Sequence, residues 1–181
     1  MSKRSSFDKV PKDFYPTCDP KAVPPKFVDF IRGKTYAEPC CGSGDLVDLL
    51  MDVATCKWET DIEYRGAGRQ RDAMTLGISD LVKCDLVITN PPYTKSVLLP
   101  MIDLFVSLKP TWLLLPADLM HNIYFGPYMD RCSKVVSVGR VCWFPKEGKR
   151  VASTENFAWY FWEKGATDDT ETMFYGREYS I

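Results

Sequence analysis

An apolar run that stops at two prolines constrains the fold of this chain more than any other feature. Residues 85–89 read Asp-Leu-Val-Ile-Thr, which is typical of a short buried strand, and Asn90, Pro91, Pro92 and Tyr93 follow directly. Proline has no backbone N–H and a fixed φ, so neither a strand nor a helix continues through the pair. We therefore expect Asn90 and Tyr93 to lie on a rigid loop at the carboxyl end of a strand, where open α/β sheets bind their ligands.

This loop offers groups that suit the binding of an amino group. The Asn90 side chain and the Pro91 backbone each present a carbonyl oxygen, and two neighbouring acceptors match the two hydrogens of an –NH2 group. An amino group conjugated to a planar ring is a poor nucleophile, and acceptors on its hydrogens favour a more reactive, pyramidal nitrogen. Tyr93 would stack on the planar group. The alternative is an ordinary proline turn in which Tyr93 only packs.

Length and composition favour a single α/β domain. The 181 residues are 45% hydrophobic and 26% charged, which is enough apolar material for one core. We expect one domain over residues 1–181, with flexible residues 1–12 and an acidic tail over 165–181. No stretch of the sequence is long and apolar enough to span a membrane.

Cysteine usage and charge indicate a cytoplasmic protein without a metal site. The chain has seven cysteines, no CxxC pair and a polar N-terminus without an apolar signal core, which favours a reducing cytosol. His121 is the only histidine, which argues against a zinc site or a histidine-based triad. Net charge is −1, and residues 163–181 hold five acids and two bases, a net of −3, so residues 1–162 carry +2. Two basic clusters, one at Arg65, Arg69 and Arg71 and one at Lys146, Lys149 and Arg150, are either phosphate contacts or solvated faces.

Hydrophobic patterns predict alternating strands and helices. Strands are expected over 34–38, 56–61, 69–75, 86–89 and 112–115, and helices over 45–53, 98–106 and around 119–132. In the second of these helices Leu98, Met101, Ile102, Phe105 and Val106 form one apolar face, and Pro100 is acceptable only in the first turn. Two final strands, over 135–138 or extended to 143 and over 157–162, should pair antiparallel at the edge of an otherwise parallel sheet.

A Gly-rich turn between the first strand and the first of these helices forms a second candidate site. Residues 38–45 read Glu-Pro-Cys-Cys-Gly-Ser-Gly-Asp, which is neither the full GxGxxG fingerprint nor a P-loop. Glu38 would repel a pyrophosphate but would suit a cationic ligand, and Asp61 after the second strand could hold ribose hydroxyls. The alternative is an ordinary tight turn between a strand and a helix.

Together, the two segments resemble the motifs of the amino-group DNA methyltransferases, and in particular the small bacteriophage-type adenine methyltransferases. Residues 38–44 resemble the S-adenosylmethionine motif of that family, and residues 90–93 resemble its catalytic motif. Tyr15-Pro16-Thr17 resembles a further cofactor segment of the family, and Asp61 and Asp72 match its two acidic positions. The resemblance covers most of residues 13–162 and implies a Rossmann-like methyltransferase fold.

The resemblance also implies roles for individual residues. Catalysis would rest on Asn90, Pro91, Pro92 and Tyr93. S-adenosylmethionine would be bound by Tyr15, Pro16, Thr17, Glu38, Pro39, Cys40, Gly42, Gly44, Asp45, Asp61, Asp72 and Asn90. Glu38 and Asp45 would line its amino-acid end, Asp61 its ribose and Asp72 its adenine. The methyl group would pass directly from sulfonium to nitrogen, without a metal and without a cysteine nucleophile, since Pro39-Cys40 lies in the cofactor turn rather than in the catalytic loop.

The implied substrate is the N6 amino group of adenine in DNA, so we expect a site-specific adenine DNA methyltransferase acting in the cytoplasm of a bacterial host. Lys146, Lys149 and Arg150 would contact phosphates. A separate target-recognition domain would add ~100 residues or more, for which the sequence has no segment, so specificity should be short or relaxed. Adenine in RNA, a protein glutamine amide, and a non-catalytic cofactor- or nucleic-acid-binding module acting against restriction stay open as alternatives.

Overall fold

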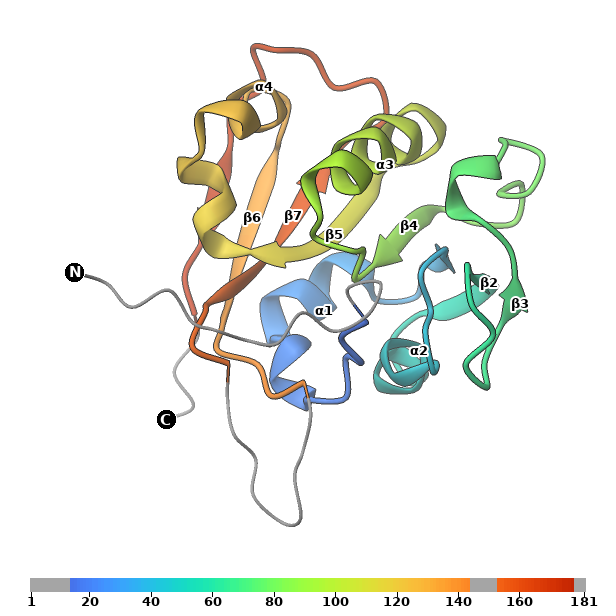
Figure 1. Ribbon diagram of the computed structural model, residues 1–181. Helices are drawn as coiled ribbons and strands as arrows, with labels where there is room; N and C mark the ends of the chain where they lie inside the picture. Colours follow the sequence, from blue (N-terminus) through green and yellow to red (C-terminus); the bar gives the residue numbers. More distant parts are fainter. Residues whose placement is uncertain (1–13, 144–152, 178–181) are drawn as a thin grey trace.

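The computed structural model describes residues 14–143 and 153–177, which form an eight-stranded sheet with helices on both faces (Figure 1). The strands are β1 (Thr35–Glu38), β2 (Thr55–Asp61), β3 (Arg69–Gln70), β4 (Leu86–Thr89), β5 (Thr111–Pro116), β6 (Lys134–Gly139), β7 (Phe157–Trp162) and β8 (Met173–Tyr175). The α-helices are α1 (Pro25–Ile31), α2 (Asp45–Leu50), α3 (Lys95–Leu108) and α4 (Gly126–Met129), and the 3₁₀ helices are η2 (Pro20–Ala22), η3 (Ala73–Thr75), η4 (Ala117–His121) and η5 (Ile123–Phe125).

The order of the strands creates the place for a ligand. The sheet runs β3-β2-β1-β4-β5-β7-β6-β8, so the chain moves outward from β1 on one side and returns to β4 on the other. Strands β3, β2, β1, β4 and β5 are parallel, whereas β7 runs antiparallel to both β5 and β6. A reversal of strand order leaves a crevice outside the carboxyl ends of the two central strands. The loops that follow β1 and β4 meet at this crevice.

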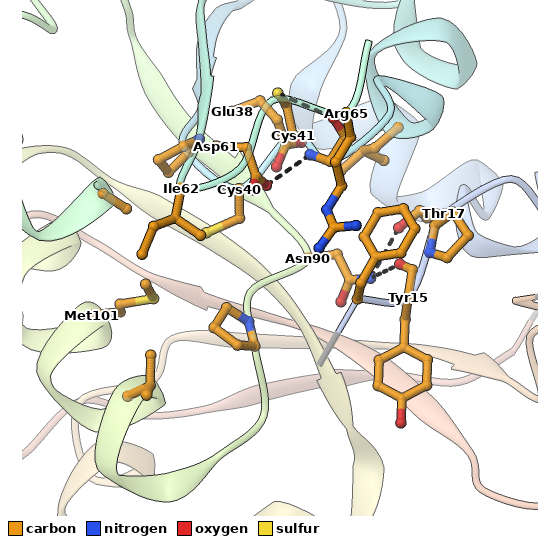
Figure 2. A pocket seen from close by; sticks show the side chains of 18 of the residues that line it. Tyr15, Thr17, Glu38, Cys40, Cys41, Asp61, Ile62, Arg65, Asn90 and Met101 are labelled. Carbon is orange, nitrogen blue, oxygen red and sulfur yellow. Dashed lines mark hydrogen bonds between the residues drawn. The ribbon is translucent and has the colours of Figure 1, made fainter. Parts of the chain in front are cut away.

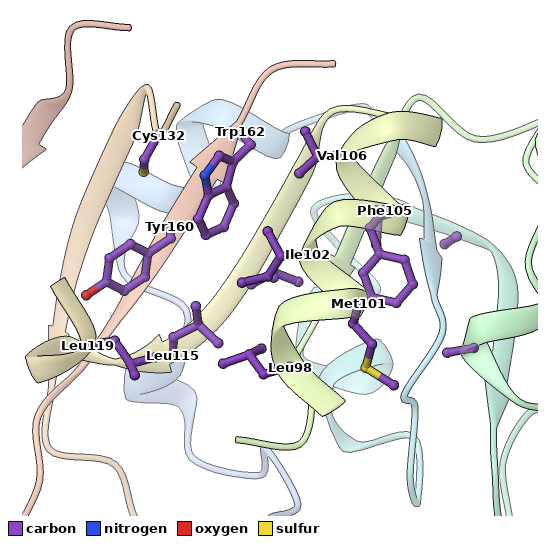
Figure 3. Close-up of a cluster of buried hydrophobic side chains, with 14 of the residues drawn as sticks. Leu98, Met101, Ile102, Phe105, Val106, Leu115, Leu119, Cys132, Tyr160 and Trp162 are labelled. Carbon is purple, nitrogen blue, oxygen red and sulfur yellow. The ribbon is translucent and has the colours of Figure 1, made fainter. Parts of the chain in front are cut away.

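The core lies in two layers, one on each face of the sheet. Alternate residues of β5 show the division, because Trp112 and Leu114 pack with α1 and α2, whereas Leu113 and Leu115 pack with α3. The apolar face of α3 expected from the sequence is buried against β5 and β7 (Figure 3). Every residue of β4 and β7 is buried, and their sequences do not alternate between apolar and polar residues, because both faces of these strands are covered.

The N-terminal segment is fastened across the carboxyl end of the sheet. Asp19 is 4% exposed, and its carboxylate accepts hydrogen bonds from the backbone N–H groups of Lys21 and Cys142, at 3.1 and 2.9 Å. The indole N–H of Trp159 donates to the carbonyl of Ala22 at 2.7 Å. These contacts hold residues 15–17 beside the crevice.

The expected fold class is confirmed, and the predicted strands match closely. The mostly parallel sheet, the antiparallel strands near the C-terminal end and the exact span of β4 are as expected. Helix α2, which follows the Gly-rich turn, ends at Leu50 rather than at residue 53. The strand expected over 69–75 is confined to Arg69–Gln70, because the Asp72 carboxylate accepts from the N–H of Met74 and starts a 3₁₀ turn.

The prediction of one helix around residues 119–132 is wrong. The segment holds η4, η5 and the short α4 instead. Asn122 is extended, and its side chain donates to the carbonyls of Asp118 and Leu119, which ends the first turn. Pro127 then starts a new helix, since its ring fits only an early helical position.

Three further differences have local causes. Pro100 lies in the second turn of α3, not in the first; the carbonyl left without a donor belongs to exposed Ser96 and is open to water. Strand β6 does not reach residue 143, because Gly139 has a φ of +84° and leaves the extended conformation. The acidic tail contains β8, which pairs parallel with β6.

Within the described residues, none of the helices has the length and apolarity needed to cross a bilayer.

Candidate active site

A cavity of about 320 Å³ opens at the crevice between β1 and β4 (Figure 2). It is lined by eleven of the residues that the sequence singled out: Tyr15, Pro16, Thr17, Glu38, Pro39, Cys40, Gly42, Asp61, Asp72, Asn90 and Pro92. Four others, Gly44, Asp45, Pro91 and Tyr93, are adjacent in the chain but do not line it. The N-terminal segment, the Gly-rich turn and the proline loop, which are far apart in the sequence, are thus brought together.

Glu38 is a buried carboxyl group at the end of β1. It is 1% exposed, its Oε1 accepts a hydrogen bond from the hydroxyl of Thr89, and its Oε2 has no hydrogen-bond partner among the described residues. The pKa of Glu38 is raised to about 8, mainly because burial disfavours the charged form; the Thr89 hydroxyl works against this rise, and the negative charge of Asp61 adds to it. A buried carboxylate needs a compensating partner, so this wall of the cavity suits a cation.

Asp61 ties the turn after β1 to the turn after β2. Its Oδ2 accepts from the N–H of Gly42 and its Oδ1 from the N–H of Glu63, both at 2.9 Å. Each carboxylate oxygen keeps a further lone pair, so Asp61 can still accept from hydroxyl groups of a ligand. Asp72 lines the cavity while its side chain also caps η3.

The two glycines of the turn are needed for different reasons. Gly42 has a φ of +54°, and a Cβ there would lie 2.7 Å from the ring of Phe14. Gly44 has a φ of +89° at the start of α2, and a Cβ would lie 2.9 Å from the Cβ of Ala67. Gly42 therefore keeps the cavity wall thin, whereas Gly44 allows two turns to pack. Asp45, the first residue of α2, accepts from the hydroxyl of Ser43.

The side-chain amide of Asn90 is held on both sides. Its Nδ2 donates to the carbonyl oxygen of Tyr15 and to the hydroxyl of Thr17, both at 3.0 Å, and its Oδ1 accepts from the hydroxyl of Tyr93 at 2.5 Å. These partners define which end of the amide is oxygen, because Nδ2 faces two acceptors and Oδ1 faces a donor. The acceptor expected from the sequence is thus present in a fixed orientation.

Tyr93 belongs to an aromatic cluster beside the cavity. Its ring is stacked on that of Tyr15, with 5.9 Å between centroids and 15° between planes, and it also contacts Phe157 at 5.9 Å. Trp143 contacts both Tyr15 and Phe157 and closes the cluster. The proline loop is therefore flanked by flat apolar surfaces.

Arg65 was not predicted to be part of the site. It lines the cavity, its guanidinium lies 4.1 Å from the centroid of the Phe14 ring, and it pairs with Glu63. Among the described lining residues it is the only lysine or arginine. The sequence signal was its cluster with Arg69 and Arg71, but Arg71 is bound by Asp80 through two hydrogen bonds of 2.9 Å. Lys146, Lys149 and Arg150 lie outside the described residues.

The cysteines of the turn are neutral thiols. Burial raises the pKa of Cys41 to about 12 and raises that of Cys40 well above its ordinary range. Neither thiol is activated as a nucleophile, since the thiolate is the reactive form. Over residues 14–143 and 153–177, no three His, Cys, Asp or Glu side chains gather as a possible metal site.

Comparison with known proteins identifies the fold. No family model and no curated protein sequence matches the chain. A structure from Vibrio vulnificus YJ016, described as a modification subunit of a type I restriction enzyme, matches with a TM-score of 0.58 and 11% identity over 90% of this chain and 47% of that chain. The modification protein of the type I restriction enzyme EcoKI matches with a TM-score of 0.54 and 12% identity over 94% and 49%.

A third match has a TM-score of 0.52 and 15% identity over 87% of this chain and 61% of the other. It is a Listeria monocytogenes protein described as a class I S-adenosylmethionine-dependent methyltransferase. This chain spans about half to three-fifths of the length of the three structures. At these identities the likeness establishes the fold, which is the Rossmann-like fold of the class I methyltransferases, as expected from the sequence motifs.

Proposed function

We propose that the chain is an S-adenosylmethionine-dependent methyltransferase that methylates the exocyclic N6 amino group of adenine in DNA. The observation that carries the proposal is the orientation of Asn90, whose Oδ1 accepts from Tyr93 while its Nδ2 is held by Tyr15 and Thr17. An amide fixed in this way presents an acceptor, not a donor, to an incoming amino group.

The cavity fits S-adenosylmethionine by its chemistry. The Oε2 of buried Glu38, which has no hydrogen-bond partner among the described residues, would accept from the ammonium group of the cofactor. Asp61 would accept from the ribose hydroxyls and Asp72 from the adenine amino group, with apolar walls from Ile62 and Met101. The rest of the wall would be formed by Tyr15, Pro16, Thr17, Pro39, Cys40 and Gly42. Gly44 and Asp45, at the start of α2, would support this wall without lining it. The bound cofactor supplies a methyl group on a positively charged sulfur.

The residues of the proline loop would position the nucleophile. The Asn90 Oδ1 and the Pro91 carbonyl would accept the two hydrogens of the target amino group, and Tyr93 would stack on the base. Transfer would form the nitrogen–carbon bond as the sulfur–carbon bond breaks, and the nitrogen would then release one proton toward solvent. Pro92 would keep the loop rigid, since its φ is fixed.

Several features favour DNA as the polymer. Two of the similar structures are described as modification proteins of type I restriction enzymes. Residues 1–162 carry a net charge of +2, and we propose that Lys146, Lys149 and Arg150 contact phosphates. A target base in a duplex would have to leave the stack, and the aromatic cluster of Tyr15, Tyr93, Trp143 and Phe157 adjoins the place where it would enter.

A labelling experiment tests the proposal. The protein is incubated with methyl-labelled S-adenosylmethionine and with DNA oligonucleotides that contain or lack adenine, with RNA, and with a bacterial protein extract, and the products are digested to nucleosides and amino acids for mass spectrometry. We expect N6-methyl-2′-deoxyadenosine from the adenine-containing DNA and no label in RNA or protein. Equal labelling of adenine-free DNA would overturn the assignment of adenine as the target base. Label in RNA or on glutamine would identify RNA or protein, in place of DNA, as the substrate.

Two variants separate catalysis from binding. Asn90→Ala should lower kcat by roughly 100-fold or more, because the acceptor aligned with the amino group is lost. Asn122→Ala is the matched control, since the bonds of that amide to described residues all go to carbonyls of its own turn. An Asn90→Ala variant that binds the cofactor and retains every activity of the wild-type protein would indicate a non-catalytic module.

A further inference from the structure

Thr17 connects two parts of the candidate site that are distant in the sequence. Its side chain is 4% exposed, it lines the cavity, and its Oγ1 accepts a 3.0 Å hydrogen bond from the Nδ2 of Asn90 (Figure 2). The backbone carbonyl of Tyr15 accepts from the same Nδ2 at 3.0 Å. The N-terminal segment thus engages the catalytic amide directly.

These two acceptors oppose rotation of the amide. A half-turn of the Asn90 side chain would place Oδ1 against the Tyr15 carbonyl and the Thr17 oxygen, where acceptors would face acceptors. The same half-turn would present an –NH2 group to the target amino group, where donors would face donors. The orientation of Asn90 therefore depends on residues that are not part of the catalytic loop.

Thr17 has one hydrogen-bonding capacity that the described residues do not use. Its oxygen accepts from Asn90, but its own hydroxyl proton has no acceptor among the described residues. Because the side chain lines the cavity, a ligand oxygen there can accept that proton. The hydrogen bonds then run in one direction, from the target amino group to Asn90, from Asn90 to Thr17 and from Thr17 to the cofactor. Aligned hydrogen bonds of this kind polarise and strengthen one another.

We propose that Thr17 is a positioning residue that holds the Asn90 amide in its productive orientation and couples that orientation to occupancy of the cofactor cavity. The proposal rests on the proposed function, since it assumes that Asn90 acts on an amino group. It gives the buried hydroxyl a role in the transfer step in addition to cofactor contact.

The test follows the side-chain NH2 resonances of Asn90 by NMR, which requires no turnover. The resonances are assigned by their absence in Asn90→Ala. Thr17→Val keeps the size of the side chain but removes the hydroxyl, Thr17→Ser restores the hydroxyl, and Thr17→Ala is a second hydroxyl-free variant. Thr111→Val is the matched control, because Thr111 is also buried and its hydroxyl bonds, within the described part of the chain, to the Lys109 carbonyl at the far end of β5.

We expect slow hydrogen exchange of the Asn90 NH2 group in the wild-type protein and a shift of its resonances when S-adenosylhomocysteine is added. Thr17→Val should speed the exchange by roughly tenfold or more and abolish the shift, and kcat should fall roughly 10- to 100-fold, with recovery in Thr17→Ser. Asn90 resonances in Thr17→Val that match those in Thr111→Val would overturn the proposal. A wild-type protein that methylates nothing would refute the proposed function instead, while the NMR comparison still decides the role of Thr17.

Discussion

The hydroxyl of Tyr93 donates a 2.5 Å hydrogen bond to the Oδ1 of Asn90, the same oxygen that we assign to the target amino group. Tyr93 therefore satisfies an acceptor that has no other donor among the described residues. A substrate amino group must replace this hydroxyl before its own hydrogens can be held. Tyr93 thus has two separable parts, a ring that can stack on the substrate and a hydroxyl that competes with it.

Substitution of Tyr93 should separate these parts. Tyr93→Phe keeps the ring and removes the competing donor, so KM for the nucleic acid should stay the same or fall. Tyr93→Ala removes stacking worth about 1–3 kcal/mol, so KM should rise roughly 5- to 150-fold. Steady-state kinetics on one oligonucleotide checks both. If both variants raise KM equally, the hydroxyl rather than the ring binds the substrate.

The buried carboxyl of Glu38 should make stability depend on pH. Its pKa is about 8 in the folded protein against an ordinary value of 4.5, so between these values the folded state binds more protons than the unfolded chain. The free energy of unfolding should therefore fall as pH rises through this window, by at most about 1.4 kcal/mol per pH unit from this group. The free energy of unfolding, measured by urea titration at several pH values in this window, should change less with pH for Glu38→Gln than for the wild-type protein. Equal changes in the two proteins would contradict the raised pKa.

Cofactor binding should release a proton through the same residue. Near neutral pH most of the folded protein carries Glu38 protonated, and a cationic ligand favours the carboxylate, so its pKa should fall on binding. Calorimetry with S-adenosylmethionine in two buffers of different ionisation enthalpy should detect release of up to about one proton in the wild-type protein and none in Glu38→Gln. Equal heats in both buffers for the wild-type protein would rule out this coupling.

The two glycine substitutions Gly42→Ala and Gly33→Ala should differ in cofactor affinity. Both positions have positive φ, at +54° and +72°, so each alanine should cost about 1–2 kcal/mol of stability. Nothing lies within 4 Å of a Cβ at Gly33, whereas at Gly42 it would meet Phe14 at 2.7 Å. Only Gly42→Ala should weaken cofactor binding, by roughly tenfold, in a titration followed by calorimetry. Equal affinity in the two variants would show that Phe14 does not shape the cavity.

Replacement of Pro100 should stabilise the protein. Pro100 is exposed in the second turn of α3 and provides no N–H for the carbonyl of Ser96. Pro100→Ala restores that hydrogen bond, and we expect a gain of about 1–3 kcal/mol in the free energy of unfolding, measured by urea titration. A loss of stability would indicate that the proline ring packs favourably.

The elements predicted correctly are those whose residues define them locally. The strand ending at Thr89 is bounded by prolines that no tertiary contact can override, and the apolar face of α3 has a clear helical period. The segment 119–132 has apolar residues at suitable spacing, but the side chain of Asn122 bonds to carbonyls of the preceding turn and stops the helix. That outcome depends on a local competition that periodicity does not report.

Part of the candidate site could also be predicted from the sequence, because its residues lie in local motifs. Residues such as Glu38, Gly42 and Asn90 lie in motifs, and the strand order brings those motifs together. The contribution of Arg65 could not be foreseen, because its place over Phe14 depends on how the loop after β2 folds. The bond from Asn90 to Thr17 spans 73 positions, and no pattern in the sequence pairs two such residues.

The two ends of the described sheet have a consequence for the protein in concentrated solution. Strand β3 is two residues long and β8 is three, and they form the opposite ends of the strand order. Strand β3 pairs only with Thr60 and Asp61 of β2, so residues 55–59 of β2 have no strand partner on that side among the described residues. The exposed charge of Lys57 on this part of β2 and the shortness of β3 and β8 both disfavour the addition of a strand from a second chain, which would extend the sheet into an aggregate.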